Sequence, residues 1–215
     1  MSTLPRDGGV AVLTGDLVGS RALSAGELER ARAALETAAR DVAGWEPGLV
    51  AGAGLEFFRG DSWQLCLARP ARWLRVALFA RARLKALGRG FDTRIGVGLG
   101  PVERLDNERV SRSTGAAFER SGAALDGMRR RDRLVLHAEG AAPELPVVAT
   151  LCAAVADGWT SGQASAVLGV LGAPPNDTQA RIAARIGIAQ PTLARALARA
   201  RFEALAAALA WTERG

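Results

Sequence analysis

Along the first two thirds of the chain, segments with two different patterns of apolar and polar residues follow one another. Short, continuous apolar runs are typical of buried strands, whereas apolar residues that recur every three or four positions are typical of helices. The sequence predicts strands over residues 9–14, 49–58, 62–68, 93–102 and 133–137, and helices over residues 24–44, 70–88 and 113–128. The predicted order is therefore βαββαβ, followed by one more helix and one more strand.

Several residues mark where the predicted helices begin. Ser24 and Glu27 have the spacing of a capping box, and Pro70 suits the first turn of the second helix. In the fourth predicted strand, Gly96, Gly98 and Gly100 alternate, so one face of that strand carries no side chains. We expect a backbone segment or a ligand to approach this face closely.

The βαββαβ order favours an α+β, ferredoxin-like domain in which the first and third strands are neighbours at the centre of one antiparallel sheet. Asp16 follows the first strand and Asp61 precedes the third, so this topology brings the two carboxylates together. Paired carboxylates beside glycine backbone suit a divalent cation that carries a phosphate. The alternative interpretation is that both aspartates are ordinary turn residues.

The composition changes after residue 140, and the rest of the chain reads as helical. Residues 147–159 form a strongly apolar helix, and a further helix follows over residues 160–171. We therefore divide the chain into an α+β domain over residues 1–140, a connecting helix over residues 141–159, and an all-α domain over residues 160–215.

Residues 178–197 have the pattern of a helix-turn-helix. Gly187 supplies the turn, and Pro191 stands in the first turn of the second helix, where its missing N–H costs nothing. Five apolar residues would be buried between the two helices: Ile182, Ile186, Ile188, Leu193 and Leu197. The predicted DNA-binding residues are Gln190, Thr192, Arg195 and Arg199. The alternative is an ordinary helical hairpin whose arginines face solvent.

The composition indicates which partners and which cellular compartment are compatible with the chain. The net charge is +6, with 28 basic and 22 acidic residues, which is compatible with a polyanionic partner. Cys66 and Cys152 lie in apolar stretches, typical of buried thiols in a reducing compartment. We find no signal peptide and no apolar run long enough to span a membrane, so we expect a cytoplasmic protein.

Three segments of the predicted α+β domain resemble class III nucleotidyl cyclases. Residues 14–20 (TGDLVGS) resemble their Asp-Ile-x-Gly-Ser signature, residues 58–62 (FRGDS) their Gly-Asp hairpin, and residues 94–102 (RIGVGLGPV) their Arg-Ile-Gly strand. The chain is more similar still to the bacterial SatD-like proteins, which share this degenerate cyclase pattern. The resemblance covers residues 10–137.

The resemblance implies particular roles for residues in these segments. Asp16, the carbonyl of Leu17 and Asp61 would hold Mg²⁺, and a purine nucleotide would lie against Gly19, Ser20 and Gly60. Cyclases also use an Asn and an Arg on the third helix.

Aligning that helix on Gly115 puts Glu119 at the Asn position and Ala123 at the Arg position, with Arg120 as a substitute only if the register shifts. Loss of a charge-stabilising arginine at a phosphoryl-transfer centre commonly costs orders of magnitude in rate. We therefore assign no catalytic residue.

These features favour a DNA-binding regulator that binds double-stranded DNA as a homodimer, with a cyclase-like domain that binds a nucleotide or mediates dimerisation. Two alternatives remain open at this point. One is a divergent magnesium-dependent nucleotidyl cyclase or nucleotide-processing enzyme, and the other is a protein-interaction scaffold in which both acidic turns are structural.

Overall fold

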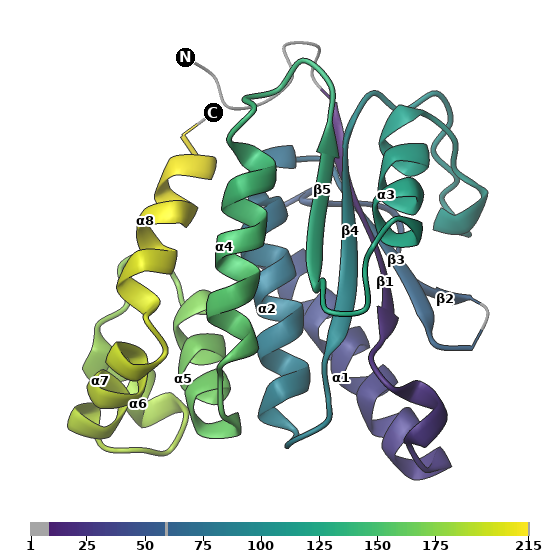
Figure 1. Cartoon of the computed structure of the whole chain (residues 1–215). Coiled ribbons are helices and arrows are strands. Elements are labelled where there is room, and N and C mark those ends of the chain that lie inside the picture. Colours follow the sequence, from purple (N-terminus) through teal and green to yellow (C-terminus); the bar gives the residue numbers. More distant parts are fainter. Residues whose placement is uncertain (1–8, 59, 215) are drawn as a thin grey trace.

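The chain forms an α+β structure in which helices pack on both faces of a five-stranded mixed sheet (Figure 1). A computed structural model describes residues 9–58 and 60–214, so residues 1–8, residue 215 and Arg59, which belongs to the predicted hairpin tip, lie outside the described part. The strands are β1 (Val10–Leu17), β2 (Val50–Phe58), β3 (Ser62–Leu67), β4 (Thr93–Gly100) and β5 (Leu134–Ala138). The helices are α1 (Ala25–Ala43), α2 (Trp73–Ala86), α3 (Ala116–Asp126), α4 (Leu145–Asp157), α5 (Ser161–Leu171), α6 (Gln179–Arg185), α7 (Gln190–Arg199) and α8 (Phe202–Thr212).

The strand order is β2-β3-β1-β4-β5. The central strand β1 is antiparallel to both β3 and β4, which confirms the predicted adjacency of the first and third strands. β5 extends the sheet and runs parallel to β4. In this register Asp16 lies opposite Ser62 of β3 on one side and Arg94 of β4 on the other.

β1 is longer than its apolar pattern predicts. The prediction ends the strand at Thr14, but hydrogen-bonded neighbours on both sides carry it to Leu17. Gly15 allows this because a Cβ at that position would overlap the ring of Trp63 and the carbonyl of Arg94. Asp16 is therefore a strand residue and does not lie in a turn after the strand.

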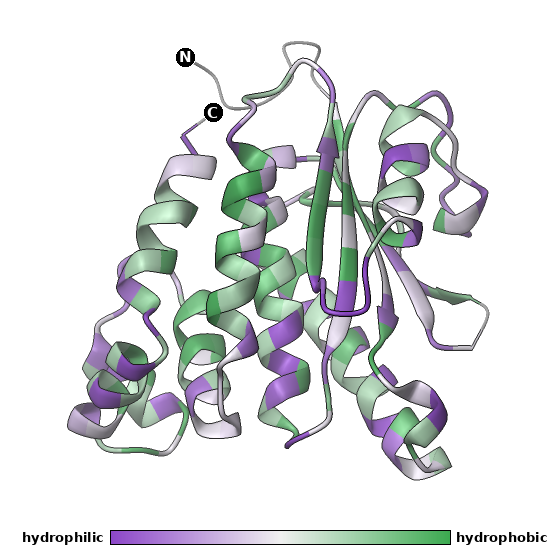
Figure 2. Cartoon of the chain, in the orientation of Figure 1, coloured by the Kyte–Doolittle hydropathy of each residue, from purple (hydrophilic) through white to green (hydrophobic). Residues whose placement is uncertain are grey.

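The two faces of the sheet carry different layers. Ala11 and Leu13 belong to the larger core, which α1, α2 and α4 cover, whereas Val12 faces a smaller core with α3. This alternation follows from the two-residue period of a strand. In Figure 2, hydrophobic residues run along β4, β5 and α4, and hydrophilic residues recur on α6 and α7.

α3 packs directly on the side-chain-free face of β4. A Cβ on Gly96 or Gly98 would overlap backbone atoms of α3, and one on Gly100 would meet the guanidinium of Arg120. The predicted close approach is therefore made by a helix. α3 begins only after Gly115, later than the predicted start at residue 113, because Gly115 has a φ of 134° and Thr114 pairs with Arg104.

α1 begins at the capping residue that the sequence predicts, whereas α2 begins three residues later than predicted. Ser24 and Glu27 form the predicted capping box of α1, and Thr160 and Gln163 form another at α5. Pro70 opens a single 3₁₀ turn, Pro70–Arg72, and α2 begins immediately after it.

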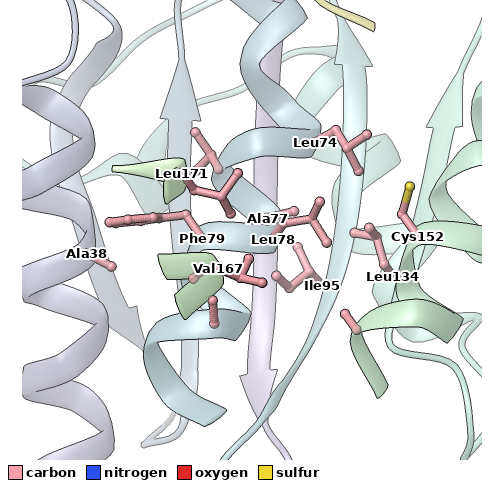
Figure 3. Packing of buried hydrophobic residues seen from close by; sticks show 14 of the residues in the cluster. Ala38, Leu74, Ala77, Leu78, Phe79, Ile95, Leu134, Cys152, Val167 and Leu171 are labelled. Atoms are coloured by element: carbon pink, nitrogen blue, oxygen red, sulfur yellow. The ribbon is translucent and has the colours of Figure 1, made fainter. Parts of the chain in front are cut away.

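The helices after residue 160 share a core with the sheet. Val167 and Leu171 of α5 lie in the same cluster as Phe79 of α2 (Figure 3). The same apolar cluster also includes residues of β1 and α8. The predicted boundary at residue 160 therefore does not separate two hydrophobic cores. Because α5 is anchored on α2, the position of α6 and α7 is tied to the sheet.

A fully buried arginine joins α2, α4 and the segment before β4. Arg81 donates to Asp92 at 3.0 and 2.6 Å, to Asp157 at 2.7 Å, and to the carbonyl of Ala153 at 3.3 Å. Two carboxylates and a carbonyl thus satisfy a cation that burial would otherwise penalise heavily. None of the helices in the described part of the chain is long and apolar enough to cross a membrane.

Candidate functional site

The predicted metal ligand Asp16 is bound by an arginine. Arg94 donates from Nε to one carboxylate oxygen of Asp16 at 2.9 Å and from a terminal nitrogen to the other oxygen. The pair is bidentate, the strongest geometry for an arginine and a carboxylate. The two residues face each other because antiparallel pairing of β1 and β4 puts them directly opposite.

Asp61 lies in the turn before β3, close to Asp16. Its carboxylate accepts a hydrogen bond from the hydroxyl of Ser20, and its backbone carbonyl accepts one from the N–H of Leu17 at 3.3 Å. Gly19 and Gly60 have φ values of 66° and 88°, the left-handed region that glycine adopts without strain. The two acidic segments are therefore adjacent, as their topology predicts.

Arg94 lies among the carboxylates of the two acidic segments. The pKa of Arg94 is raised, chiefly by its hydrogen bond to Asp16, and the carboxylates of Asp61 and Asp126 add to the effect. Asp16 and Asp61 offer oxygen ligands of the kind magnesium prefers, but both oxygens of Asp16 already bind the guanidinium. In the structure these residues form an ion-pair cluster, and a divalent cation at Asp16 and Asp61 stays a prediction. Within residues 9–58 and 60–214, no three His, Cys, Asp or Glu side chains are grouped to hold a metal ion.

A buried polar network continues from this cluster along β1. Gln64 donates to the hydroxyl of Thr14 at 2.9 Å, and the hydroxyls of Thr14 and Ser121 share a hydrogen bond of 2.8 Å. Ser121 in turn donates to the carbonyl of Phe118 at 2.9 Å. Because every side-chain member has a partner, the network fixes α3 on the sheet beside Asp16.

The structure places Arg120 away from the acidic cluster. It donates to the carbonyl of Leu99 at 2.8 Å and pairs with Glu139, at the opposite end of β4 from Arg94. Leu99 lies five residues after Arg94 along the strand, a distance of about 17 Å. Arg120 therefore cannot replace the arginine missing at Ala123, which is exposed on α3 together with Glu119.

α6 and α7 are joined by a four-residue turn, residues 186–189, centred on Gly187. The N–H of Gly187 bonds to the carbonyl of Ala184 at 3.2 Å, and the N–H of Ile188 bonds to that of Ala183 at 3.0 Å. With a φ of 75° at Gly187, these two bonds form a Schellman motif. Glycine at this position therefore ends α6 abruptly and sets the direction of α7.

Of the predicted DNA-binding residues, Thr192, Arg195 and Arg199 lie on one side of α7, whereas Gln190, seven residues before the buried Leu197, lies on the side that faces α6. Leu193 and Leu197 are buried, whereas Gln190, Thr192, Arg195 and Arg199 are exposed. Gln190 donates to the side chain of Gln179 on α6 at 3.3 Å. Residues 178–201 contain five arginines and no acidic residue. Among the described residues, no carboxylate pairs with the two arginines on α7.

Comparisons with known proteins do not assign the chain to a family. No model of a known protein family matches the chain, and no curated protein matches its sequence.

The residue that sequence reasoning missed is Arg94. Its position two residues before Gly96 places it on the glycine face of β4, and antiparallel pairing with β1 sets it opposite Asp16. The first fact follows from the sequence, whereas the place of Arg94 opposite Asp16 depends on the register of β4 on β1. Its role as the partner of Asp16 becomes clear only from the register.

Proposed function

We propose that the chain is a DNA-binding transcription regulator of the SatD-like kind, with α6 and α7 as its helix-turn-helix. The observation that carries the proposal is the geometry of the two helices: a Schellman turn at Gly187 joins them, and α7 exposes Thr192, Arg195 and Arg199 together. A recognition helix reads base edges with residues near its N-terminus, and cationic side chains contact phosphates.

The charge of this surface supports binding to a polyanion. Arg181 of α6 and Arg201, which follows α7, are also exposed, so exposed arginines recur from residue 181 to residue 201. Of these, Arg185 pairs with Asp177. An ordinary helical hairpin would more often balance these charges with acidic residues at helical spacing. The absence of any Asp or Glu in this segment favours the DNA-binding interpretation over the solvated hairpin.

We further propose that the sheet and its helices form a catalytically degenerate, cyclase-like domain. The order β2-β3-β1-β4 is that of a ferredoxin-like sheet, and β5 adds a parallel edge strand. The pairing of Asp16 with Arg94 and the exposed Ala123 both count against phosphoryl transfer. In this proposal the domain binds a nucleotide or pairs with a second copy, so that the homodimer presents two recognition helices to a pseudo-palindromic site.

A titration of the purified chain against fragments of its own genome, including the region upstream of its gene, tests the proposal. We expect specific binding that weakens steeply as salt rises from about 50 to about 200 mM. Arg131→Gln serves as a control, because Arg131 is an exposed arginine in the loop before β5. If the wild-type protein shows no salt-sensitive binding to DNA, the proposal that the chain is a DNA-binding regulator is wrong.

The second candidate is a divergent nucleotide-processing enzyme. The hydrogen bond between Ser20 and Asp61 favours it, since both residues match the cyclase pattern and lie together. Incubation with ATP or GTP and with magnesium or manganese decides between the two. The regulator proposal expects little or no cyclic nucleotide, whereas turnover of about 1 per second or faster would support the enzyme.

A further inference from the structure

A cleft of about 640 Å³ opens between the sheet-packed helices and the C-terminal helices, away from the acidic cluster. It is bounded by the end of α1, by α2, and by α5 and α6. Trp45 and Phe79 form its aromatic part, with ring centroids 4.9 Å apart in an edge-to-face arrangement. Both its size and its mixture of apolar and polar lining residues are typical of a small-molecule site.

Three arginines line this cleft, from three different helices: Arg40 of α1, Arg83 of α2 and Arg185 of α6. Of the residues that the structure describes, one carboxylate, Asp41, lines it with them, and it pairs with Arg83. Arg185 pairs with Asp177 at 2.6 Å, while no carboxylate pairs with Arg40 among the described residues. The cleft thus carries an excess of positive charge.

The guanidinium of Arg83 is only partly satisfied within the chain. Its Nε is buried and lacks a hydrogen-bond partner in the described part of the chain, although its guanidinium carbon lies 5.4 Å from the centre of the Phe79 ring. A buried charged donor without an acceptor is costly, so such groups are normally satisfied. Because Nε is buried from solvent and a terminal nitrogen pairs with Asp41, a ligand in the cleft would meet the terminal nitrogens of Arg83.

The cleft is kept open by small residues of α5 and its end. A Cβ on Gly169 would come within 3.0 Å of the side chain of Ile186, and one on Gly172 within 3.0 Å of the ring of Phe79. Larger residues at these positions would therefore press on the walls of the cleft. The glycines leave the aromatic and apolar walls accessible beside the arginines.

We propose that this cleft binds a small organic anion. Its carboxylate or phosphate group is held by Arg40, Arg83 and Arg185, because guanidinium groups bind both anions in a planar, bidentate way. The flat apolar part of the ligand packs on Trp45. If this part is an aromatic ring, cation–π attraction to the neighbouring guanidinium groups stabilises it further. The ligand bridges α1 and α2 with α6, and so links the sheet to the C-terminal helices.

Four probes of related structure test the proposal by calorimetry on the full chain. Naphthoate and naphthyl phosphate carry a ring and an anion, naphthol carries the ring alone, and inorganic phosphate carries the anion alone. We expect at least one of the two aromatic anions to bind with Kd below about 1 mM, and naphthol and phosphate to bind at least about tenfold more weakly. The preferred anion identifies the headgroup as carboxylate or phosphate.

Variants locate the site. Arg40→Gln and Arg185→Gln should each weaken binding of the preferred aromatic anion by about tenfold or more, and Arg131→Gln should leave it unchanged. Bound ligand should also raise the melting temperature of the wild type, since it binds only the folded chain. Equal binding by Arg40→Gln, Arg185→Gln and wild type, or no binding of either aromatic anion, would overturn the proposal. The measurement needs no DNA, so its outcome is independent of the regulator proposed above.

Discussion

Arg94 binds both carboxylate oxygens of Asp16 across the pairing of β4 with β1. This ion pair occupies the position at which the cyclase resemblance implies a metal ion. It also places a positive charge among the carboxylates of Asp16, Asp61 and Asp126. Arg94 therefore balances part of the negative charge of these three carboxylates.

The first prediction concerns this cluster. Arg94→Gln should lower the free energy of unfolding by about 1–2 kcal/mol, because it leaves neighbouring carboxylates without their cation at a partly exposed site. Urea denaturation measures the loss, and about 1 M salt should reduce it by screening the repulsion. Arg89→Gln, an exposed arginine elsewhere, is the control.

A double-mutant cycle checks that the effect of Arg94→Gln comes from the pair. Adding Asp16→Asn should recover part of the loss, since it removes one of the unbalanced carboxylates. If the double variant loses the sum of the two single losses, Asp16 and Arg94 are not coupled.

The second prediction concerns pH. Burial opposes ionisation of Asp92, but the hydrogen bonds and charge of Arg81 outweigh it, so the pKa of Asp92 is lowered from its ordinary value. A carboxyl whose pKa is lower in the folded state contributes stability above its unfolded pKa, near 4, and loses it as pH falls through the folded pKa. The wild type should therefore lose stability below about pH 4.

Asp92→Asn separates this contribution from other titrations. At neutral pH it should destabilise the chain by about 3 kcal/mol, because it removes one partner of a buried cation. The gap to wild type should narrow as pH falls below about 4. Asp157→Asn, at the more exposed partner of Arg81, should cost less. A pH-independent gap for Asp92→Asn would contradict the assignment.

The third prediction compares a glycine of β4 that α3 covers, Gly98, with a glycine within α3 itself, Gly122. Gly98→Ala should cost about 1–3 kcal/mol, since its Cβ would overlap the carbonyl of Ala117 and force α3 away from β4. Gly122→Ala, inside α3 with open space around it, should stabilise by about 0.5–1 kcal/mol through helix propensity. Thermal unfolding measures both, and equal effects of the two substitutions would mean that α3 does not pack closely on the glycine face.

The fourth prediction divides the roles of two arginines on α7. Arg195 lies in the first turns, so Arg195→Ala should weaken specific DNA binding by about 1–3 kcal/mol and relax sequence preference. Arg199 lies a turn later, so Arg199→Ala should weaken binding to all sequences alike and reduce its salt dependence. Titrations at two salt concentrations separate these effects. The same loss of specificity for both variants would contradict the division.

The sequence by itself determined the elements and most of their neighbours. Local signals have local causes: the capping box at Ser24 and Glu27 begins α1, and the positive φ that Gly187 adopts without strain ends α6. The order of the elements was enough to bring Asp16 and Asp61 into adjacent segments.

The tertiary structure alone decided what these residues contact. Whether β1 stops at Thr14 or runs to Leu17 depends on hydrogen bonds from strands far away in the sequence, and the identity of the partner of Asp16 depends on the register of β4. Arg120 lies where the packing of α3 on glycine puts it. The cleft beside Trp45 exists because α5 packs on α2, a long-range contact that no local pattern records.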